Sequence, residues 1–367
     1  MATKDSRPNV SIRGCIKIGI VLLALFTTFH LGFYIIVESK ALRRIDTDIG
    51  MIRNYSANIA RRIRGHLKQF NVSENVTASM AIDERTNRTA SLPECPATPP
   101  NLVGPLATYR HEPSFAEMEA NLSYLKSGVN FSPRECRTDQ RVAIVIPYRN
   151  RASHLRTLLY NLHTMLERQQ INYGIFVIEQ AGNSTFNRGL LMNIGYTEAI
   201  KSYNYSCFVF HDVDLVPEND RIYYGCGQNP RHLSAAVDKF NYRLPYKGIV
   251  GGVTQLPRKV LQKINGFSNL YFGWGGEDDD LGIRLKISNY TVERYSLVIS
   301  RYRMLKHQRE KGNAPNPKRR KLLKHAAERM KTDGLNSLTY KVLNTQRGKL
   351  FTNVTVEVNH NSYVIKI

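Results

Sequence analysis

The sequence predicts an α/β fold, a Rossmann-like parallel sheet in a single large domain that follows a transmembrane helix and a stem. Two observations carry this prediction. Between residues 142 and 210, short apolar runs that suit buried strands alternate with segments of helical periodicity. Ahead of them, residues 18–37 form an uncharged, apolar run long enough to cross a bilayer. Strands that alternate with helices build parallel sheets, which bind ligands at the carboxyl ends of their strands.

The elements follow one another at the spacing of such a sheet. Residues 142–146, 173–178 and 207–210 are short runs rich in β-branched and aromatic residues, as buried parallel strands are. The segment 154–168 places its leucines on one face of a predicted helix. A second helix is predicted to begin at 186–188 and to end near Lys201. The order is therefore strand, helix, strand, helix, strand.

The loops after these strands carry side chains suited to a ligand. Pro147-Tyr-Arg-Asn-Arg151 supplies guanidinium groups that fit ribose or diphosphate oxygens. Phe186-Asn-Arg188 follows the second strand, and His211-Asp-Val-Asp214 follows the third. We expect these three loops to surround one crevice. The sequence contains no Gly-x-Gly-x-x-Gly, so a dinucleotide is not indicated.

Acidic residues gather at two places. Residues 273–280 read Gly-Trp-Gly-Gly-Glu-Asp-Asp-Asp and contain the only Trp of the chain, and Asp212-Val-Asp214 is the second cluster. Adjacent carboxylates repel one another, so four in a row are rarely kept for stability. They suit a bound cation, a polyhydroxyl ligand or proton abstraction, and the alternative is a solvated acidic turn. Together the two clusters favour a site for a nucleotide sugar.

The N-terminal third divides into a cytosolic tail (1–17), a signal-anchor helix (18–37) and a stem (38–94), ahead of a luminal domain (95–367). A cleaved signal peptide is the rival interpretation, but Glu38-Ser-Lys40 follows the run instead of a small-residue cleavage site. Glycosylation sequons lie after the anchor, which places the bulk of the chain in the lumen. They occur at Asn54, Asn71, Asn75, Asn87, Asn121, Asn183, Asn204, Asn289 and Asn353.

The luminal part holds four cysteines, Cys95, Cys136, Cys207 and Cys226, which allow three pairings. We favour Cys95–Cys136 and Cys207–Cys226 because each closes a short loop, and an oxidising lumen favours disulfides. No Cys-x-x-Cys spacing indicates structural zinc. The net charge of +22 raises the question of nucleic acid, but the basic residues are spread along the chain of a luminal protein. We therefore expect no nucleic-acid partner.

Read together, these segments resemble the β-1,4-galactosyltransferases, inverting, manganese-dependent enzymes of the Golgi with a GT-A type fold. The resemblance runs in order from about residue 95 to residue 350. It is carried by the segments 142–151, 186–188, 211–214, 237–240, 244–246, 251–253, 264–267, 273–280, 303–307, 316–317 and 333–340.

The resemblance implies a nucleotide site and a metal site. Asp214, Met304 and His307 would hold Mn²⁺, and the role of Met304 rests on the motif alone. Asp278 would be the catalytic base. The residues implied in donor binding are Pro147, Tyr148, Arg149, Asn150, Arg151, Phe186, Asn187, Arg188, Asp212, Val213, Asp214, Ile249, Trp274 and His307.

The resemblance also implies an acceptor site that a lid completes. The acceptor would meet Tyr246, Gly276, Glu277, Asp278, Asp279 and Arg319. Glycines on both sides of Trp274 would let that loop swing, and a segment from Lys306 to about Arg329 would be the longer lid. Arg320 stands where the family usually carries an aromatic residue.

Ile249 stands where the galactosyltransferases carry Tyr beside the C2 substituent of the donor, so we expect room for an N-acetyl group. The chain would then be most like the β-1,4-N-acetylgalactosaminyltransferases and use UDP-GalNAc, with UDP-Gal as the alternative donor. The acceptor would be a terminal GlcNAc on a glycoprotein or glycolipid. The expected setting is the Golgi membrane, in which the chain would be a single-pass type II protein. A homodimer is one oligomeric state that it could form. A competing hypothesis is a sugar-binding protein without turnover, which the intact Asp214 and Asp278 disfavour.

Overall fold

The computed structural model describes residues 92–109, 112–122, 125, 130–306 and 313–363. The expected tail and anchor, nearly all of the expected stem, and His307 lie outside these residues. Within the described part of the chain, no helix is long and apolar enough to span a membrane.

A seven-stranded sheet in the order β5-β7-β3-β1-β2-β10-β9 forms the centre of the fold. Strand β1 (Arg141–Tyr148) pairs in parallel with β2 (Asn172–Gln180) on one side and with β3 (Cys207–His211) on the other. The three strands expected from the sequence are confirmed, each slightly longer than its apolar run. Strand β10 (Thr352–Glu357) adds a fourth parallel strand beside β2.

The edges of the sheet are antiparallel, so the expectation of a purely parallel sheet needs correction. Strand β7 (Val253–Pro257) runs against β3, β5 (Arg231–His232) against β7, and β9 (Lys341–Arg347) against β10. Every residue of β9 is exposed, and β5 is only two residues long. Neither strand therefore produces the apolar run by which a buried strand is recognised.

A second, three-stranded sheet lies in the order β4-β8-β6. Strand β8 (Arg301–Met304) pairs antiparallel with β4 (Leu215–Pro217) and parallel with β6 (Ala236–Val237). In register, Met304 stands opposite Leu215, the residue that follows Asp214. This small sheet brings the end of segment 211–214 beside segment 301–304.

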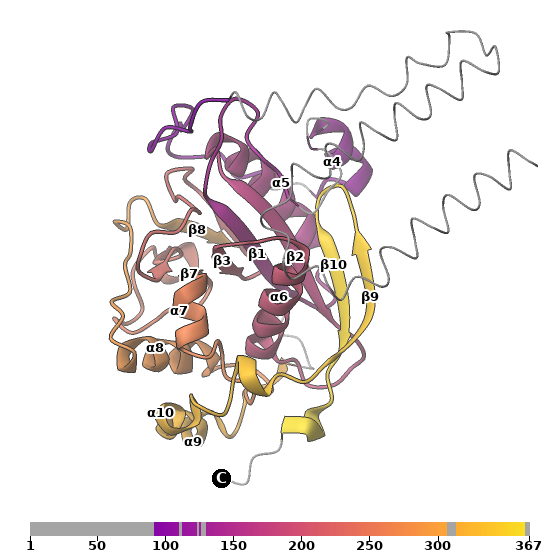
Figure 1. Cartoon of the computed structure of the whole chain (residues 1–367), viewed down its shortest axis with the longest axis vertical. Helices are drawn as coiled ribbons and strands as arrows, with labels where there is room; N and C mark the ends of the chain where they lie inside the picture. The colour runs from indigo at the N-terminus through magenta and orange to yellow at the C-terminus, as the bar shows by residue number, and fades with distance from the viewer. Residues whose placement is uncertain (1–91, 110–111, 123–124, 126–129, 307–312, 364–367) are drawn as a thin grey trace, which may run out of the picture. The chain divides into compact units, whose positions relative to one another are not determined.

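Two helices cover opposite faces of the central sheet (Figure 1). Alternate residues of β1 divide between the two core clusters on these faces. Val142, Ile144 and Ile146 belong to the core cluster of α5 (Ala152–Arg168), while Ala143 and Val145 belong to that of α6 (Arg188–Ser202). Both predicted helices are confirmed. The second begins at Arg188, where the side chain of Asn187 accepts a hydrogen bond from the Leu190 amide as an N-cap.

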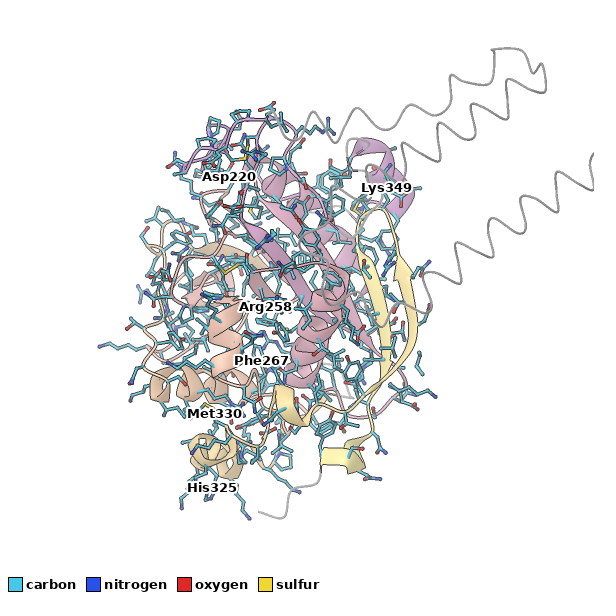
Figure 2. The ribbon with its side chains drawn as sticks, viewed as in Figure 1. Asp220, Arg258, Phe267, His325, Met330 and Lys349 are labelled. Atoms are coloured by element: carbon cyan, nitrogen blue, oxygen red, sulfur yellow. A yellow bond between two sulfur atoms is a disulfide. The ribbon has the colours of Figure 1, made fainter. Side chains whose placement is uncertain are left out.

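The remaining helices pack around this frame. Figure 1 shows α8, α9 and α10 gathered beyond one end of the sheet, and Figure 2 labels Phe267, which packs edge-on against Phe210 of β3 with ring centroids 4.9 Å apart. The bounds are α4 (Phe115–Asn121), η3 (Asp238–Phe240), α7 (Arg258–Lys263), α8 (Glu277–Ile287), α9 (Arg319–Lys324), α10 (Ala326–Arg329), η5 (Leu335–Ser337) and η6 (His360–Tyr363).

Both favoured disulfides are present. Cys95 pairs with Cys136, and Cys207 at the start of β3 pairs with Cys226. Of the three connectivities that four cysteines allow, the one with short loops is confirmed. The second bridge ties the β3 strand to the segment that leads into β5.

Candidate active site

A large cleft, with a volume of about 1350 Å³, opens where β1, β2 and β3 end. Its walls come from the loops after these strands, from segments 245–252 and 274–279, and from the end of β8. The expectation that the three loops share one crevice at the carboxyl end of the sheet is therefore confirmed.

Most of the residues expected in a donor, acceptor or metal site line this cleft. They are Pro147, Arg149, Arg151, Phe186, Arg188, Asp212, Val213, Asp214, Tyr246, Ile249, Trp274, Gly276, Glu277, Asp278, Asp279, Met304 and Arg319. Three others, Tyr148, Asn150 and Asn187, do not line it. Asn187 is fully buried, and its side chain both caps α6 and donates to the Asn269 carbonyl oxygen at 2.8 Å.

Arg188 joins the two acidic clusters. Its Nε donates to Oδ1 of Asp212 at 2.6 Å, and its Nη1 lies 3.4 Å from Oε1 of Glu277. Its Nη2 donates to the Gly252 carbonyl oxygen at 3.3 Å. Burial alone would lower the pKa of Arg188, but Asp212 and Glu277 together raise it, so the guanidinium stays charged. One cation thus offsets part of the repulsion between carboxylates that are distant in sequence.

Two carboxyl groups of the cleft, those of Glu277 and Asp278, have raised pKa values. Burial, followed by the neighbouring Asp278, raises the pKa of Glu277 to about 7, although Arg188 opposes the shift. Burial is also the main reason why the pKa of Asp278 is raised, with Arg188 lowering it and Asp279 raising it. Raised carboxylate pKa values of this kind are typical of sites that move protons.

The four acidic residues of segment 273–280, called the octet below, occupy the first turn of α8 but have different surroundings. Asp278 and Asp279 are half-buried at the cleft, and Oδ1 of Asp279 accepts from the Tyr246 hydroxyl at 2.7 Å. Glu277 is mostly buried, and its Oε2 has no hydrogen-bond partner among the described residues. All four carboxylates lie near the positive end of the helix dipole, which favours negative charge.

Asp280 faces away from the cleft and is fully buried. Its Oδ1 accepts from Nε of Arg284 at 2.6 Å, and its Oδ2 accepts from Nη2 of Arg329 at 2.8 Å and from the Tyr271 hydroxyl at 2.9 Å. This carboxylate therefore ties α8 to α10. The octet combines a structural residue with residues that face a ligand space.

Two of the three expected metal ligands meet at the end of the small sheet. Asp214 and Met304 both line the cleft, and the Leu305 amide donates to the Asp214 carbonyl oxygen at 2.7 Å. The Asp214 carboxylate fits a divalent-cation site, since hard cations prefer oxygen ligands, whereas this preference does not account for the Met304 thioether. The third expected ligand, His307, lies outside the described residues. Within the described ranges, no cluster of three or more His, Cys, Asp or Glu side chains is arranged to hold a metal ion.

Asp238 is a cleft residue that was not expected in the site. It lines the cleft at the start of η3, and its Oδ1 accepts a hydrogen bond from the Met304 amide at 2.8 Å. The only signal in the sequence was its place in the segment 237–240, which carries the resemblance. Its role in fixing β8 depends on a contact across 66 residues that no local pattern reveals.

Arg149 and Phe186 form another part of the cleft wall. The Arg149 guanidinium carbon lies 5.1 Å from the centre of the Phe186 ring, and its Nη1 donates to the Ser184 carbonyl oxygen at 2.5 Å. A guanidinium held over an aromatic ring is a rigid, flat surface suited to a nucleoside.

Trp274 stands at the mouth of the cleft with 54% of its surface exposed. Its amide donates to the Ala314 carbonyl oxygen at 2.9 Å, and its own carbonyl accepts from the Asn316 amide at 3.0 Å. The preceding Gly273 has a φ of +91°, and a Cβ there would lie 2.5 Å from the same Ala314 oxygen. The loop around Trp274 and segment 314–316 are therefore joined by one isolated parallel β-bridge, between Trp274 and Pro315.

A mixed α/β fold with two acidic clusters, arginine side chains and an exposed Trp around one cleft is compatible with a glycosyltransferase, and comparison with known proteins shows this class. Residues 95–227 match the family model described as the N-terminal region of glycosyl transferase group 7, and residues 231–308 match the N-terminal domain of galactosyltransferase.

Curated relatives extend the match. Human β-1,4-galactosyltransferase 1 is 49% identical over 269 residues, which cover 73% of this chain and 68% of the relative. β-1,4-Galactosyltransferase 4 from Cricetulus griseus is 45% identical over 277 residues, covering 75% and 80%. The chain belongs to the β-1,4-galactosyltransferase family.

The fold has a solved counterpart. The catalytic domain of Drosophila β-1,4-galactosyltransferase 7, solved in complex with xylobiose, superposes with a TM-score of 0.50 at 24% identity. The match covers 60% of this chain and 94% of that one. A mutant of the same enzyme was solved with manganese, UDP-Gal and xylobiose.

Proposed function

We propose that this protein is an inverting β-1,4-hexosyltransferase that transfers galactose or N-acetylgalactosamine from UDP to the 4-hydroxyl of a terminal GlcNAc. The observation that carries the proposal is the convergence of Asp278, Asp214 and Met304 on one cleft, beside the Arg149–Phe186 wall. The names of the curated relatives support β-1,4 transfer of galactose.

In this mechanism the acceptor 4-oxygen attacks the anomeric carbon of the donor while the bond from that carbon to the UDP oxygen breaks. Asp278 takes the proton from the attacking hydroxyl, and a single displacement on an α-linked donor gives a β-linked product. The carboxylate must be ionised to act as the base, and its raised pKa makes it a stronger one.

The remaining cleft residues would orient the two sugars. Asp279, which already accepts a hydrogen bond from Tyr246, and Glu277 would bind sugar hydroxyls. Arg149, Phe186 and Val213 would hold the uridine and ribose, and Trp274 would cover a sugar face.

Asp214 and Met304, with His307 as a third ligand, would hold Mn²⁺, which when bound would neutralise charge on the departing UDP. Asp238 would orient Met304 through its hydrogen bond to the Met304 amide. The chemistry of the Asp214 carboxylate supports this assignment, because Mn²⁺ takes oxygen ligands, and Met304 is included on the family resemblance alone.

The relatives favour UDP-Gal as the donor. UDP-GalNAc is a second candidate, which a specific observation favours: Ile249 lines the cleft, half-buried, where the galactosyltransferases carry Tyr. An isoleucine side chain is shorter than tyrosine and leaves apolar room for an acetyl methyl group. Pocket differences of this kind change discrimination roughly 10–200-fold.

A donor screen tests the proposal. The purified protein would be incubated with Mn²⁺, a GlcNAc glycoside, and either UDP-Gal or UDP-GalNAc, and the product linkage read by NMR. A β-1,4-linked disaccharide from either donor supports the proposal, and the ratio of kcat/KM values chooses the sugar. Release of UDP without disaccharide, or no reaction with either donor, would overturn it.

We further propose that the protein resides in the Golgi membrane as a single-pass type II protein with its catalytic domain in the lumen. The apolar run 18–37, the sequons and the two disulfides support this setting. Cleavage of its glycans by an endoglycosidase in intact vesicles only after detergent is added would support luminal orientation.

A further inference from the structure

The segment 247–252, which carries Ile249, is held by its backbone carbonyl groups. The carbonyl oxygens of Lys247 and Ile249 accept from Nη2 of Arg294 at 3.0 and 2.7 Å. That of Gly251 accepts from Nε2 of His232 at 2.9 Å, and that of Gly252 accepts from the Asp212 amide at 3.1 Å. Three of these bonds come from two side chains, Arg294 and His232, that do not line the cleft. Two cleft residues add to them, because the Ser234 hydroxyl donates to the Gly251 carbonyl oxygen at 3.2 Å and Nη2 of Arg188 donates to that of Gly252 at 3.3 Å.

Arg294 and His232 are also bonded to each other. Nε of Arg294 donates to Nδ1 of His232 at 3.2 Å. A guanidinium only donates and a carbonyl oxygen only accepts, so Nδ1 of His232 must be the bare nitrogen and Nε2 must carry the hydrogen. His232 is 1% exposed, and its burial, together with Arg294, lowers its pKa to about 4, which keeps the ring neutral. The two partners thus fix the tautomer of His232 as well as its orientation.

The backbone segments that carry these two side chains are held by main-chain hydrogen bonds. His232 belongs to β5, which pairs with β7, and its amide donates to the Glu293 carbonyl oxygen at 2.9 Å, next to Arg294. The Glu293 amide donates in turn to the Pro230 carbonyl oxygen at 2.9 Å. We call this pair, Arg294 and His232, the loop clamp.

The clamped segment touches the catalytic carboxylate. A Cβ placed on Gly251 would lie 2.4 Å from Oδ2 of Asp278, so the Gly251 backbone forms a wall against that side chain. Ile249 faces the cleft two residues before this contact, with its carbonyl bound to the clamp. A rotation of the peptide group after Ile249 would move both the Ile249 side chain and the wall behind Asp278.

We infer that Arg294 and His232 are positioning residues that set donor-sugar discrimination, by fixing the backbone from which Ile249 meets the C2 substituent of the donor. This inference rests on the proposed function. Discrimination by a pocket side chain needs that side chain held to within a fraction of an ångström, and supporting hydrogen bonds supply that restraint. Without the clamp, the side chain at position 249 shifts with its loop and either donor is accommodated.

A double-mutant cycle between the clamp and the pocket tests the inference. The ratio of kcat/KM values for UDP-GalNAc and UDP-Gal is measured in the wild type, in Ile249→Tyr, in Arg294→Met and in the double variant. We expect Ile249→Tyr to shift the ratio by roughly 10–200-fold in the wild type, and by no more than a few-fold when Arg294 is Met. The donor KM should move more than kcat, since the clamp acts on donor binding.

Conservative variants separate positioning from folding. Arg294→Lys keeps one donor group, and His232→Gln keeps a donor and an acceptor, so both should retain part of the shift, whereas His232→Leu should lose it. Arg258, labelled in Figure 2, bonds to Asn204 and does not line the cleft, so Arg258→Met is the matched control that should keep the full shift. Thermal unfolding checks that each variant is folded. If Arg294→Met or His232→Leu does not fold, the double-mutant cycle is measured with Arg294→Lys and His232→Gln instead.

The outcomes are distinct. If the wild type transfers neither sugar, the proposed function fails. If it transfers sugar but the shift caused by Ile249→Tyr is equally large with and without the clamp, the clamp inference is overturned while the proposed function stands. A lower rate with both donors and an unchanged shift would likewise reduce the clamp to a structural role and overturn the inference.

Discussion

Nε of Arg188 lies 2.6 Å from Oδ1 of Asp212, and the same guanidinium extends to Glu277, which is 89 residues away from Arg188 in the sequence. The first residue of α6 therefore links the acidic cluster after β3 to the acidic turn that opens α8. This cation reduces the repulsion between carboxylates of the two clusters that face one cleft.

Asp278→Asn should remove most turnover and leave donor binding intact. The amide cannot accept the acceptor proton, and loss of a general base costs about 10²–10⁴-fold in rate. Turnover would be followed by release of UDP, and donor affinity by calorimetry with UDP. Near-normal turnover in this variant would assign the base to another residue, with Glu277 the next candidate.

Asp280→Asn should act on stability instead. It would leave Arg284, which is fully buried, and the mostly buried Arg329 with Asp333 as their remaining acidic partner. Breaking a buried ion pair costs about 3–5 kcal/mol, which is an upper bound here because Asp333 stays in place. Urea unfolding would compare the free energy of unfolding of this variant with that of Asp278→Asn. Because the pKa of Asp278 is raised, its ionised form is disfavoured in the fold, and Asp278→Asn should not destabilise. Equal losses of stability in both variants would contradict this division of the octet.

Much of the fold and site could be predicted because their signals are local. Strands 142–146, 173–178 and 207–210 are continuous apolar runs, and Asp212 and Asp278 stand in dense acidic motifs. The carboxyl ends of neighbouring parallel strands meet at one edge, so the loops after them had to share a crevice.

What the sequence did not predict depends on contacts between distant segments. Nothing beside Asp280 distinguishes it from Asp278; its burial follows from Arg329, 49 residues further along the chain. Likewise, His232 and Arg294 support Ile249 through main-chain carbonyls, which any residue could supply. Strand β9 was missed because all its residues are exposed, so it lacks an apolar face.

Glu277 should make the protein less stable as pH rises. Burial and Asp278 raise its pKa from 4.5 to about 7 in the fold, so between these values the folded protein keeps a proton that the unfolded chain releases. The contribution of the protonated Glu277 side chain to the free energy of unfolding is then complete below pH 4.5, and it is lost as the pH rises toward 7. In urea unfolding, the free energy of unfolding of the wild type should fall over this pH range by roughly 1–3 kcal/mol more than that of Glu277→Gln. Glu135 is exposed, so Glu135→Gln is the control variant and should lose as much stability as the wild type. If the wild type loses no more than Glu277→Gln, the prediction is contradicted.

Asp214→Asn should weaken manganese binding most, and Asp238→Asn should weaken it less. The first loses a ligand oxygen, whereas the second loosens the hydrogen bond that holds the Met304 amide, and lost outer partners cost about 10–100-fold in metal affinity. Mn²⁺ affinity would be measured by electron paramagnetic resonance in the presence of UDP, without any turnover. Asp139, on the surface outside the cleft, gives the control variant Asp139→Asn. An unchanged affinity in Asp214→Asn would remove this residue from the metal site.

Ile249→Tyr should move donor preference toward UDP-Gal, whichever donor the wild type prefers. Ile249 is half-buried in the cleft wall, and tyrosine there adds a ring and a hydroxyl in the space beside the C2 substituent. An N-acetyl group would then meet bulk, whereas the hydroxyl of galactose would gain a hydrogen-bond partner. The ratio of kcat/KM for UDP-Gal to that for UDP-GalNAc should rise by roughly 10–200-fold, mainly through loss of UDP-GalNAc activity. Ile249→Val, which adds no bulk, is the matched control and should leave the ratio near its wild-type value. If Tyr and Val change the ratio equally, or Tyr leaves it unchanged, Ile249 does not face the C2 substituent and the choice of donor lies elsewhere in the cleft.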